Sequence, residues 1–394
     1  MKANKRVVIS VLLMMLGMSM SVGIISMVLS DLVSEFSLVG AQQGYFGTFN
    51  SVGAMAALLS IFFLVGRVKK KTTMLIFAMT MMTIALFAIG SAKTFGAALI
   101  AYAFNGMGLG FMDSYSSSLI IDLQGKDSAK YMSMLHGCFA IGSLVSPILI
   151  QWILNGHTWR TVYFIYSGFL AVCVLQMAVS VFLARNAKTE AVAHSTQRIT
   201  GADLREYLGD KANILFILMM FVNMGGQYGY VYYIVRYMSM DLNRADLAAL
   251  ALTLFWLTSV IARFLYPKLK LSALKTLLVC FLLSAGSLAA GILLQNGLMM
   301  FIASILAGFG VGPGVPLTFH EGGRRFARIS SLPVTVMSIM INIARAVVPP
   351  LEGAVARAHS LQMAMLIAPL IFLGGAALSA ALMRMLEKPA PKAL

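Results

Sequence analysis

The sequence predicts an all-α polytopic membrane protein, in which twelve transmembrane helices form two pseudo-symmetric six-helix bundles. Three observations predict this class. Hydrophobic residues make up 59% of the 394 residues and charged residues only 11%, whereas about a quarter of the residues of soluble proteins are charged. The mean hydropathy is +0.86. The apolar residues are also gathered in windows long enough to cross a bilayer.

The twelve apolar windows follow one another along the whole chain. They lie at residues 7–29, 43–66, 72–92, 97–122, 132–154, 160–184, 213–237, 247–266, 275–295, 297–318, 332–352 and 361–384. Each is close to the length of about 20 residues that a transmembrane helix needs. The first window follows a basic stretch but continues to Leu29 without a small-residue cleavage site. It is therefore expected to be a retained span and not a signal peptide.

The basic residues predict the topology. A net charge of +16 would suggest a nucleic-acid partner in a soluble chain, but here the Lys and Arg residues occupy short loops, so no nucleic acid is expected. With the N-terminus inside, 23 of the 30 basic residues face the cytoplasm, five face outward, and Arg263 and Arg345 lie within spans. The positive-inside rule therefore predicts a multi-pass protein of the cytoplasmic (inner) membrane with both termini cytoplasmic.

The long polar interval from Ala184 to Ala212 divides the windows into six plus six. It predicts an N-terminal bundle of residues 1–184, a cytoplasmic linker of residues 185–212, and a C-terminal bundle with a short tail, residues 213–394. Within the linker, Thr200 and Asp203 have the spacing of a helix cap, which predicts a short surface helix. The alternative is a solvated linker.

The two halves also look like repeats of each other. Three glycines of the fourth window and a proline of the fifth recur 202 residues later, as Gly106/Gly308, Gly108/Gly310, Gly110/Gly312 and Pro147/Pro349. Asp113 has no counterpart, because Val315 occupies the matching place. Duplicated halves of this kind are typical of secondary transporters, whose substrate site lies between the halves near the bilayer midplane.

Several other classes of function lack their sequence signals. No nucleotide-binding loop is present, so direct coupling to ATP is not expected. The three cysteines, Cys138, Cys173 and Cys280, lie in apolar windows without the spacing of a metal site or a disulfide framework. We therefore expect a monomeric transporter in the lipid bilayer that is not an enzyme and needs neither a cofactor nor a metal.

Two motifs resemble the major facilitator superfamily: the basic loop from Gly66 to Lys71 between the second and third windows, and the segment from Phe255 to Arg263 at the end of the eighth. Together with the six-plus-six topology, they extend the resemblance over the whole chain. Within that superfamily the chain is most similar to the fucose-permease-type sugar symporters. That resemblance rests on the glycine-rich run that ends in Asp113 and on the segment from Leu135 to Pro147. It implies alternating access and proton-coupled symport of a sugar.

The chain also departs from the pattern of that family. Gly66 stands where the family's first loop normally has an acid, and Ser26 stands where those permeases carry a second membrane carboxylate. Gln227 stands where many relatives have a glutamate early in the seventh span. The resemblance thus implies that one proton-coupling acid is retained and that its usual partner is not.

Asp113 is the first candidate for proton coupling. It lies within the apolar segment from Ala97 to Asp122, where an unpaired charge costs at least a few kcal/mol, and intramembrane acids are usually functional. Helical spacing places it in one sector with Tyr102, Asn105 and Ser116, which are expected to contact the substrate. The alternative is a structural ion pair, most simply with Arg345. His136 is a second candidate for proton relay, and its alternative is a hydrogen-bonded packing residue.

The substrate site is expected to use amides and aromatic rings. Amides pair with hydroxyls and aromatic faces stack on sugar rings, so the polar side chains of the seventh window suit a polyhydroxylated solute. The alternatives are an aromatic belt at the outer interface for the tyrosines and helix–helix hydrogen bonds for the asparagines. The candidates are Asn223, Gln227, Tyr230 and Tyr233, with Tyr237 on the same stripe, and Asn50, Asn342 and Arg345 from other windows.

Three arginines have other expected roles. Arg345 would bind an anionic or hydroxylated substrate or hold Asp113 ionised, unless it forms a local pair with Glu352. Arg67 and Arg263 are expected to serve gating or structure.

The sequence therefore predicts a secondary active transporter that moves a small polar, sugar-like solute by alternating access, with a proton as the coupling ion. The alternative is a proton-coupled exporter or antiporter of amphipathic or anionic compounds, although the segment from Ser146 to Leu149 completes the antiporter pattern of the fifth span poorly. A sensor on the same scaffold would be a third class.

Overall fold

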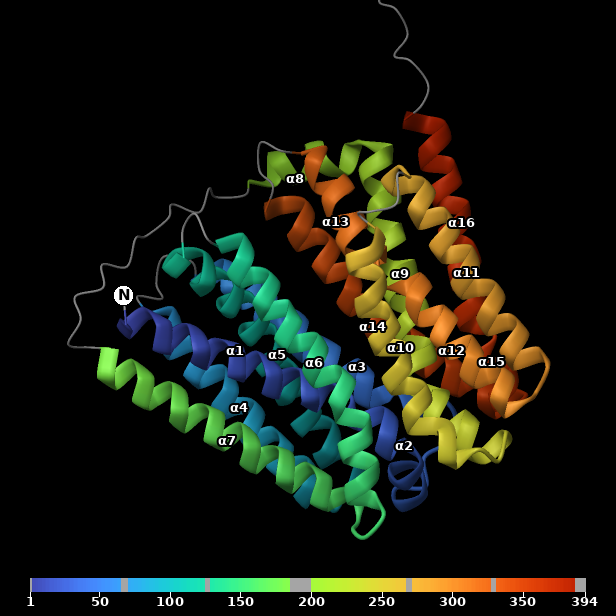
Figure 1. Ribbon diagram of the computed structural model, residues 1–394, viewed down its shortest axis with the longest axis horizontal. Helices are drawn as coiled ribbons and strands as arrows, with labels where there is room; N and C mark the ends of the chain where they lie inside the picture. Colours follow the sequence, from blue (N-terminus) through green and yellow to red (C-terminus); the bar gives the residue numbers. More distant parts are fainter. Residues whose placement is uncertain are drawn as a thin grey trace, which may run out of the picture. The chain divides into compact units, whose positions relative to one another are not determined.

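The chain is almost entirely helical in the computed structural model, which describes residues 2–64, 70–124, 128–184, 200–266, 271–326 and 331–386. No strand occurs among these residues. The helices form two compact units, Met1–Thr196 and Gln197–Leu394. In Figure 1 the helices of the first unit run from blue to light green, and those of the second continue from green to red.

The first unit begins with two helices in place of one predicted span. Its elements are α1 (Lys2–Val22), α2 (Ile24–Glu35), the 3-10 helix η1 (Gly40–Gly44), α3 (Tyr45–Leu64), α4 (Lys71–Ser91), α5 (Phe95–Gln124), α6 (Ser128–Leu154) and α7 (Trp159–Ala184). The predicted window 7–29 thus covers most of α1 and the first half of α2, which are separated at Gly23. The unit contains the six predicted spans.

The second unit divides two more of the predicted spans. Its elements are α8 (Gly201–Gly209), α9 (Lys211–Arg236), the π-helix η3 (Tyr237–Asp241), α10 (Ala245–Leu265), α11 (Ala273–Leu293), α12 (Gly297–Val311), α13 (Gly314–Arg324), α14 (Ser331–Ala358), α15 (Leu361–Met365) and α16 (Ile367–Leu386). The window 297–318 divides into α12 and α13 at Gly312 and Pro313, because a proline has no N–H for the helical ladder.

Eleven helical segments of the described part are long and apolar enough to cross a membrane. The remaining predicted window, 43–66, coincides with α3, a helix of 20 residues that ends at Leu64 beside residues 65–69, which are not described. The all-α membrane architecture predicted from the sequence is confirmed.

The same packing scheme recurs in both units. In the first unit α5 packs against α3 and α4, α4 packs against α7, and α1 packs against α6 and α7. In the second unit α12 packs against α10 and α11, α11 packs against α16, and α9 packs against α14 and α16. The pairs therefore correspond one to one, which confirms the internal repeat.

The repeated glycines lie at the closest of these contacts. A Cβ atom on Gly106 or Gly110 would overlap the backbone of α3 at Asn50 or Ala54, and one on Gly108 would lie 2.8 Å from the carbonyl oxygen of Ala78 on α4. In the second unit, Cβ atoms on Gly308 and Gly312 would overlap α10, and one on Gly310 would overlap α11. Only glycine lets the backbones approach this closely, so the glycines belong to the repeated scaffold.

The short helix predicted within the linker is present as α8. Thr200 is its N-cap, since the Thr200 side chain accepts a hydrogen bond from the N–H of Asp203 while the Asp203 carboxylate accepts one from the N–H of Thr200. Tyr207 of α8 is fully buried, and its ring centroid lies 5.5 Å from that of Phe326. This contact anchors α8 to the second unit.

Candidate functional site

Asp113 lies on α5 within the membrane-spanning segment Phe95–Ser117, and its side chain is exposed. A carboxylate that faced hydrocarbon would be costly, so this exposure favours a face of the helix that meets water. The predicted stripe around it does not share that face. Tyr102, Asn105 and Ser116 are all buried, because α5 is the central helix of its unit and most of its surface packs against neighbours.

Two of the buried stripe residues form hydrogen bonds within the unit. The hydroxyl groups of Tyr102 and Tyr163 bond to each other between α5 and α7. The Nδ2 of Asn105 donates to the Oδ1 of Asn50 over 3.0 Å, between α5 and α3. These contacts join helices inside the bundle, as the structural alternative for asparagine anticipated. Substrate contact by Tyr102, Asn105, Asn50 and Ser116 stays a prediction.

The three amides of the second unit that were predicted to contact the substrate are buried with unused hydrogen-bonding atoms. Asn223 is 0% exposed, Gln227 4% and Asn342 7%. Among the described residues, neither polar atom of the Asn223 side chain has a partner, nor do the Oε1 of Gln227 and the Oδ1 of Asn342. Buried polar groups are nearly always paired, so orphaned ones call for an explanation such as an absent ligand. All three lie on α9 and α14, which pack against each other.

Tyr230 and Tyr233 of α9 are buried as well, and so is Tyr237 at the start of η3. The ring centroid of Tyr230 lies 4.8 Å from that of Phe255 on α10, and the Tyr233 hydroxyl donates to the carbonyl oxygen of Pro349 over 2.9 Å. The Tyr237 hydroxyl donates to the carbonyl oxygen of Ile292 over 3.3 Å. The aromatic-belt alternative is therefore wrong for Tyr237, because it is buried and bonded within its unit. For Tyr230 and Tyr233, substrate stacking stays a prediction.

Arg345 and Glu352 are both on α14, and they do not form the local pair that was an alternative for Arg345. The Arg345 guanidinium lies 4.3 Å from the ring centroid of Tyr228 on α9, a cation–π contact. The Glu352 carboxyl is fully buried, and neither of its oxygens has a hydrogen-bond partner among the described residues. Sequence reasoning considered Glu352 only as a partner for Arg345, although comparison of the repeats could have singled it out.

The remaining candidates fall in different places. Arg263 donates from Nε to the carbonyl oxygen of Gly312 over 3.0 Å, at the division between α12 and α13, which fits a structural role. His136 is exposed on α6. Arg67 lies outside the described residues.

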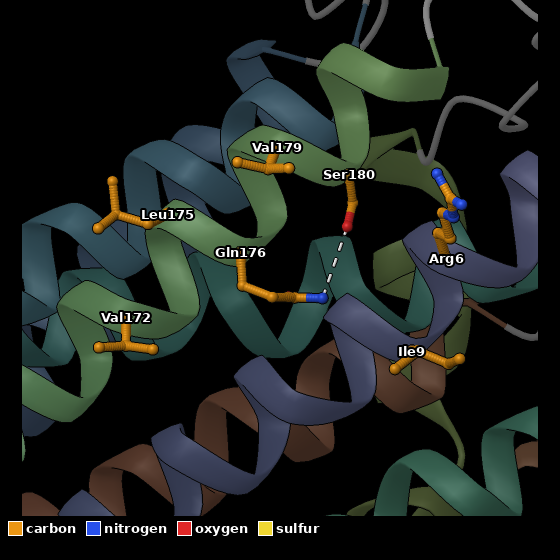
Figure 2. Close-up of a pocket in the computed structure, with 7 residues that line it drawn as sticks. All are labelled: Arg6, Ile9, Val172, Leu175, Gln176, Val179 and Ser180. Atoms are coloured by element: carbon orange, nitrogen blue, oxygen red, sulfur yellow. Dashed lines mark hydrogen bonds between the residues drawn. The ribbon is translucent and has the colours of Figure 1, made fainter.

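A hollow of about 470 Å³ lies at the side of the first unit between α1 and α7. Figure 2 shows its lining, with Gln176 bonded to Ser180 and Arg6 beside four aliphatic side chains. Those aliphatic side chains, Ile9, Val172, Leu175 and Val179, are between 45% and 65% exposed. Exposed aliphatic side chains on membrane-spanning helices are typical of a lipid-facing surface, so this hollow does not suit a polar solute.

Repeated helical bundles with polar side chains inside their spans define a class, the secondary transporters of membranes. The chain belongs to the Major Facilitator Superfamily, whose family model matches residues 8–319. It is a membrane transporter of that family.

Curated relatives match part of the chain, and two of them illustrate the range. The human sodium-dependent glucose transporter 1 is 25% identical over 145 residues, which cover 34% of this chain and 26% of the relative. The glucose/mannose transporter GlcP of Bacillus subtilis is 23% identical over 195 residues, 48% of this chain and 47% of the relative. The matches thus span less than half of the length of either relative.

Solved structures share the fold over nearly the whole chain. A bacterial homologue of the human lysosomal transporter Spinster, in an inward-facing and unoccupied conformation, has a TM-score of 0.77 at 14% identity and covers 99% of both chains. The nucleoside transporter NupG has a TM-score of 0.74 at 15% identity, covering 98% of this chain and 100% of its own. The E. coli fucose:proton symporter FucP has a TM-score of 0.66 at 15% identity, covering 95% of this chain and 98% of its own. These similarities show the fold.

Proposed function

We propose that the protein is a proton-coupled symporter that moves a small polar solute of the sugar class across the cytoplasmic membrane by alternating access. The observation that carries the proposal is the set of unpartnered amide atoms on Asn223, Gln227 and Asn342, buried in two packed membrane-spanning helices of the described part of the chain. Leaving such atoms unpaired costs about 1–3 kcal/mol each. Hydroxyl groups both donate and accept, so a hydroxylated solute is suited to pair with them.

Asp113 is the proton carrier in this proposal. It is exposed on a membrane-spanning helix, so its carboxylate can take up a proton from water on one side and release it on the other as access alternates. His136, exposed on α6, is the candidate for proton delivery. The names of the matched relatives, both glucose transporters, support the class of solute.

The test is solute uptake by the full-length protein in proteoliposomes, with and without an imposed pH gradient that is acidic outside. The panel contains glucose, mannose, fucose and a nucleoside. The wild type is expected to accumulate at least one of these solutes when the gradient is imposed. Asp113→Asn is expected to equilibrate the same solute without accumulating it, because the proton no longer has a carboxylate to bind. Unchanged accumulation in Asp113→Asn would remove Asp113 from proton coupling.

The amides are tested in the same assay. Gln227→Leu is expected to raise the KM at least about tenfold, since losing one hydrogen bond to a buried polar partner is worth about 1.4 kcal/mol or more. Gln176→Leu is the matched control, because Gln176 lines the lipid-facing hollow on α7. An equal change of KM in the two variants would contradict a substrate contact at Gln227.

An anionic or amphipathic compound is the second candidate solute. Arg345 is half-buried in α14, and no described carboxylate of its own unit forms an ion pair with it. A guanidinium stays charged, so it is suited to bind an anion. If no member of the panel accumulates while an anionic dye is expelled and Arg345→Gln abolishes that expulsion, the exporter is the correct assignment.

A further inference from the structure

The Glu352 carboxyl has no use in the mechanism proposed above, yet its position is unusual. It is 0% exposed in α14, six residues before the end of that helix, inside the membrane-spanning segment Thr335–Ala358. Both of its oxygens lack hydrogen-bond partners within the described part of the chain. An ionised carboxylate in such a place is costly by several kcal/mol, whereas the neutral acid is far less costly to bury.

The fold does not require an acid at this position. The spacing of 202 residues that relates Pro147 to Pro349 also relates Ile150 to Glu352. Ile150 is 0% exposed on α6, which packs against α1 as α14 packs against α9. The scaffold of the first unit thus fills the same place with an aliphatic side chain. A carboxyl that the packing does not need is a functional candidate.

The helix opposite Glu352 leaves room for the carboxyl. A Cβ atom on Gly229 of α9 would overlap the Oε1 of Glu352 and lie 3.0 Å from its carboxyl carbon. The Tyr233 hydroxyl, one turn further along α9, bonds to the carbonyl oxygen of Pro349 and not to Glu352. The carboxyl is therefore enclosed between α9 and α14, at the place where Gly229 has no side chain.

The charged groups around this enclosure are few in the part of the chain that the structure describes. On α9, Tyr233 interacts electrostatically both with Glu352 and with Arg236, which lies about one turn further along the helix. On α14 itself, Arg345 is engaged with Tyr228 and Arg357 is exposed. The short α15 has no titratable residue. The α13 residues His320 and Glu321 are remote, because α13 meets α14 near Met337, about 22 Å along the helix from Glu352.

We propose that Glu352 is a second proton-binding group of this transporter, protonated while it is packed against Gly229 and ionised when the contact between α9 and α14 opens to water. Arg236 lies on the same face of α9 as Gly229, two turns further on, and is the cation that the ionised form would face. This proposal rests on the proposed function for its role in coupling. The protonation itself can be measured without any solute.

Infrared spectra of the full-length protein, recorded from about pH 6 to about pH 9, test the protonation directly, since a buried neutral acid has its own C=O stretching band. We expect one such band at neutral pH in the wild type and in Asp113→Asn, and its loss in Glu352→Gln. Glu206→Gln, at an exposed residue of α8, is the control and keeps the band. Glu352→Leu copies the aliphatic residue of the first unit and replaces Glu352→Gln if the amide does not fold.

A band that persists in Glu352→Gln or Glu352→Leu, or no neutral-acid band in the wild type, overturns the proposal whatever the outcome of the uptake assay. A transport assay then tests separately whether protonation of Glu352 is coupled to solute movement. With a gradient of about one pH unit, worth up to about tenfold accumulation per proton, Glu352→Gln is expected to lose accumulation but to keep solute counterflow within about twofold of the wild type. A variant that loses the band and still accumulates the solute to the level of the wild type overturns the coupling role alone.

Discussion

At Gly108 of α5, the space that a side chain would need is already occupied by α4. A Cβ atom there would overlap the Met82 side chain and lie 2.8 Å from the carbonyl oxygen of Ala78. A backbone carbonyl cannot move aside as a flexible side chain can. We predict that Gly108→Ala lowers the free energy of unfolding by about 1–3 kcal/mol, measured as a fall in the thermal unfolding midpoint of the purified protein.

Gly168→Ala is the matched control for that substitution. Gly168 lies in the middle of α7, and no atom lies within 4 Å of the position that its Cβ would take. Alanine is the better helix former by about 1 kcal/mol, so this variant is expected to be neutral or slightly more stable. Similar losses of stability in the two variants would contradict the explanation from close backbone contact.

Arg160 shows how a cation predicted to face outward is bound. Its guanidinium donates to the carbonyl oxygens of Gly90 and Ala92, over 2.8 and 2.7 Å, at the C-terminal end of α4. It also pairs with Glu35, which accepts a further hydrogen bond from Trp159 over 2.9 Å. The exception to the positive-inside pattern thus has a structural reason, since these carbonyls have no helical partners of their own.

The sequence singles out residues whose burial in an apolar span costs free energy. It does not show which neighbouring helix a given side chain packs against. Asp113 and the amides of α9 became candidates because polar groups in apolar windows are rare, and their roles stay predictions. Helical spacing placed Tyr102 and Asn105 on one face with Asp113, but it could not say which neighbour each face meets. Glu352 was missed because an arginine on the same helix offered a simple partner, and only the structure shows that Arg345 lies on Tyr228 instead.

At the scale of elements, Asp210 joins three helices at one end of the second unit. It is the C-cap residue of α8 and the N-cap residue of α9, and it also binds the end of α13. Its Oδ1 accepts a hydrogen bond from the N–H of Ala212 at the start of α9, and its Oδ2 is 2.7 Å from the Nη2 of Arg325, just beyond α13. Burial would raise the pKa of Asp210, but the hydrogen bonds and the charge of Arg325 outweigh it and hold the pKa below its usual value. The carboxylate is therefore stabilising at neutral pH.

The charge and the cap can be separated by substitution. Asn is as good an N-cap as Asp, whereas Ala is not. We predict that Asp210→Asn costs no more than about 1 kcal/mol at neutral pH, the range of an exposed ion pair, and that Asp210→Ala costs about 1 kcal/mol more. The measurement is thermal unfolding of each variant.

The pH dependence gives the sign of the charge effect. A folded-state pKa below the unfolded value contributes stability that is present at neutral pH and is lost as the pH falls through the folded-state pKa. The difference between the wild type and Asp210→Asn is thus expected to shrink in acid, below the usual pKa of an aspartate. A difference that grows in acid would be incompatible with the ion pair.

Elements were predictable in number and place, but not in their breaks. The hydropathy windows predicted the spans, but three of the windows each correspond to two helices in the structure. These pairs are α1 and α2, α12 and α13, and α15 and α16. Hydropathy measures transfer of side chains and does not register a lost backbone hydrogen bond. Pro313 was a visible signal for one break, and Gly23 was a weaker signal for another.

At the scale of the whole molecule, each unit has its own complete packing scheme of six spans, with its own central helix. Domains with separate cores usually tolerate a cut in the connection between them. We predict that two chains of residues 1–196 and 197–394, produced together, retain at least about a tenth of the solute uptake of the intact protein. The measurement is uptake by cells that produce both chains.

Cells that produce either chain alone are the control, and neither is expected to transport, since the proposed proton carrier Asp113 and the proposed solute contacts Asn223 and Gln227 belong to different units. Uptake by the second chain alone would contradict that division of roles. The repeat itself was readable from the sequence, because glycines and prolines mark backbone constraints that both halves share. Asp113 and Glu352 are exceptions to the repeat, because Val315 and Ile150 occupy the matching positions.

The six scaffold glycines also bear on how such a chain can evolve. A glycine in contact with a neighbouring backbone cannot be replaced by a larger residue in either repeat. After a duplication, the matching positions of the two repeats therefore both remain glycine. Places such as those of Val315 and Ile150, where a neutral side chain serves the packing, are free to gain a charge in one copy only. A library of all single substitutions, scored for transport, is then expected to show the same intolerance at the matching glycines of both repeats. At Asp113 and Glu352 the effect of substitution is expected to differ from that at the matching positions, Val315 and Ile150.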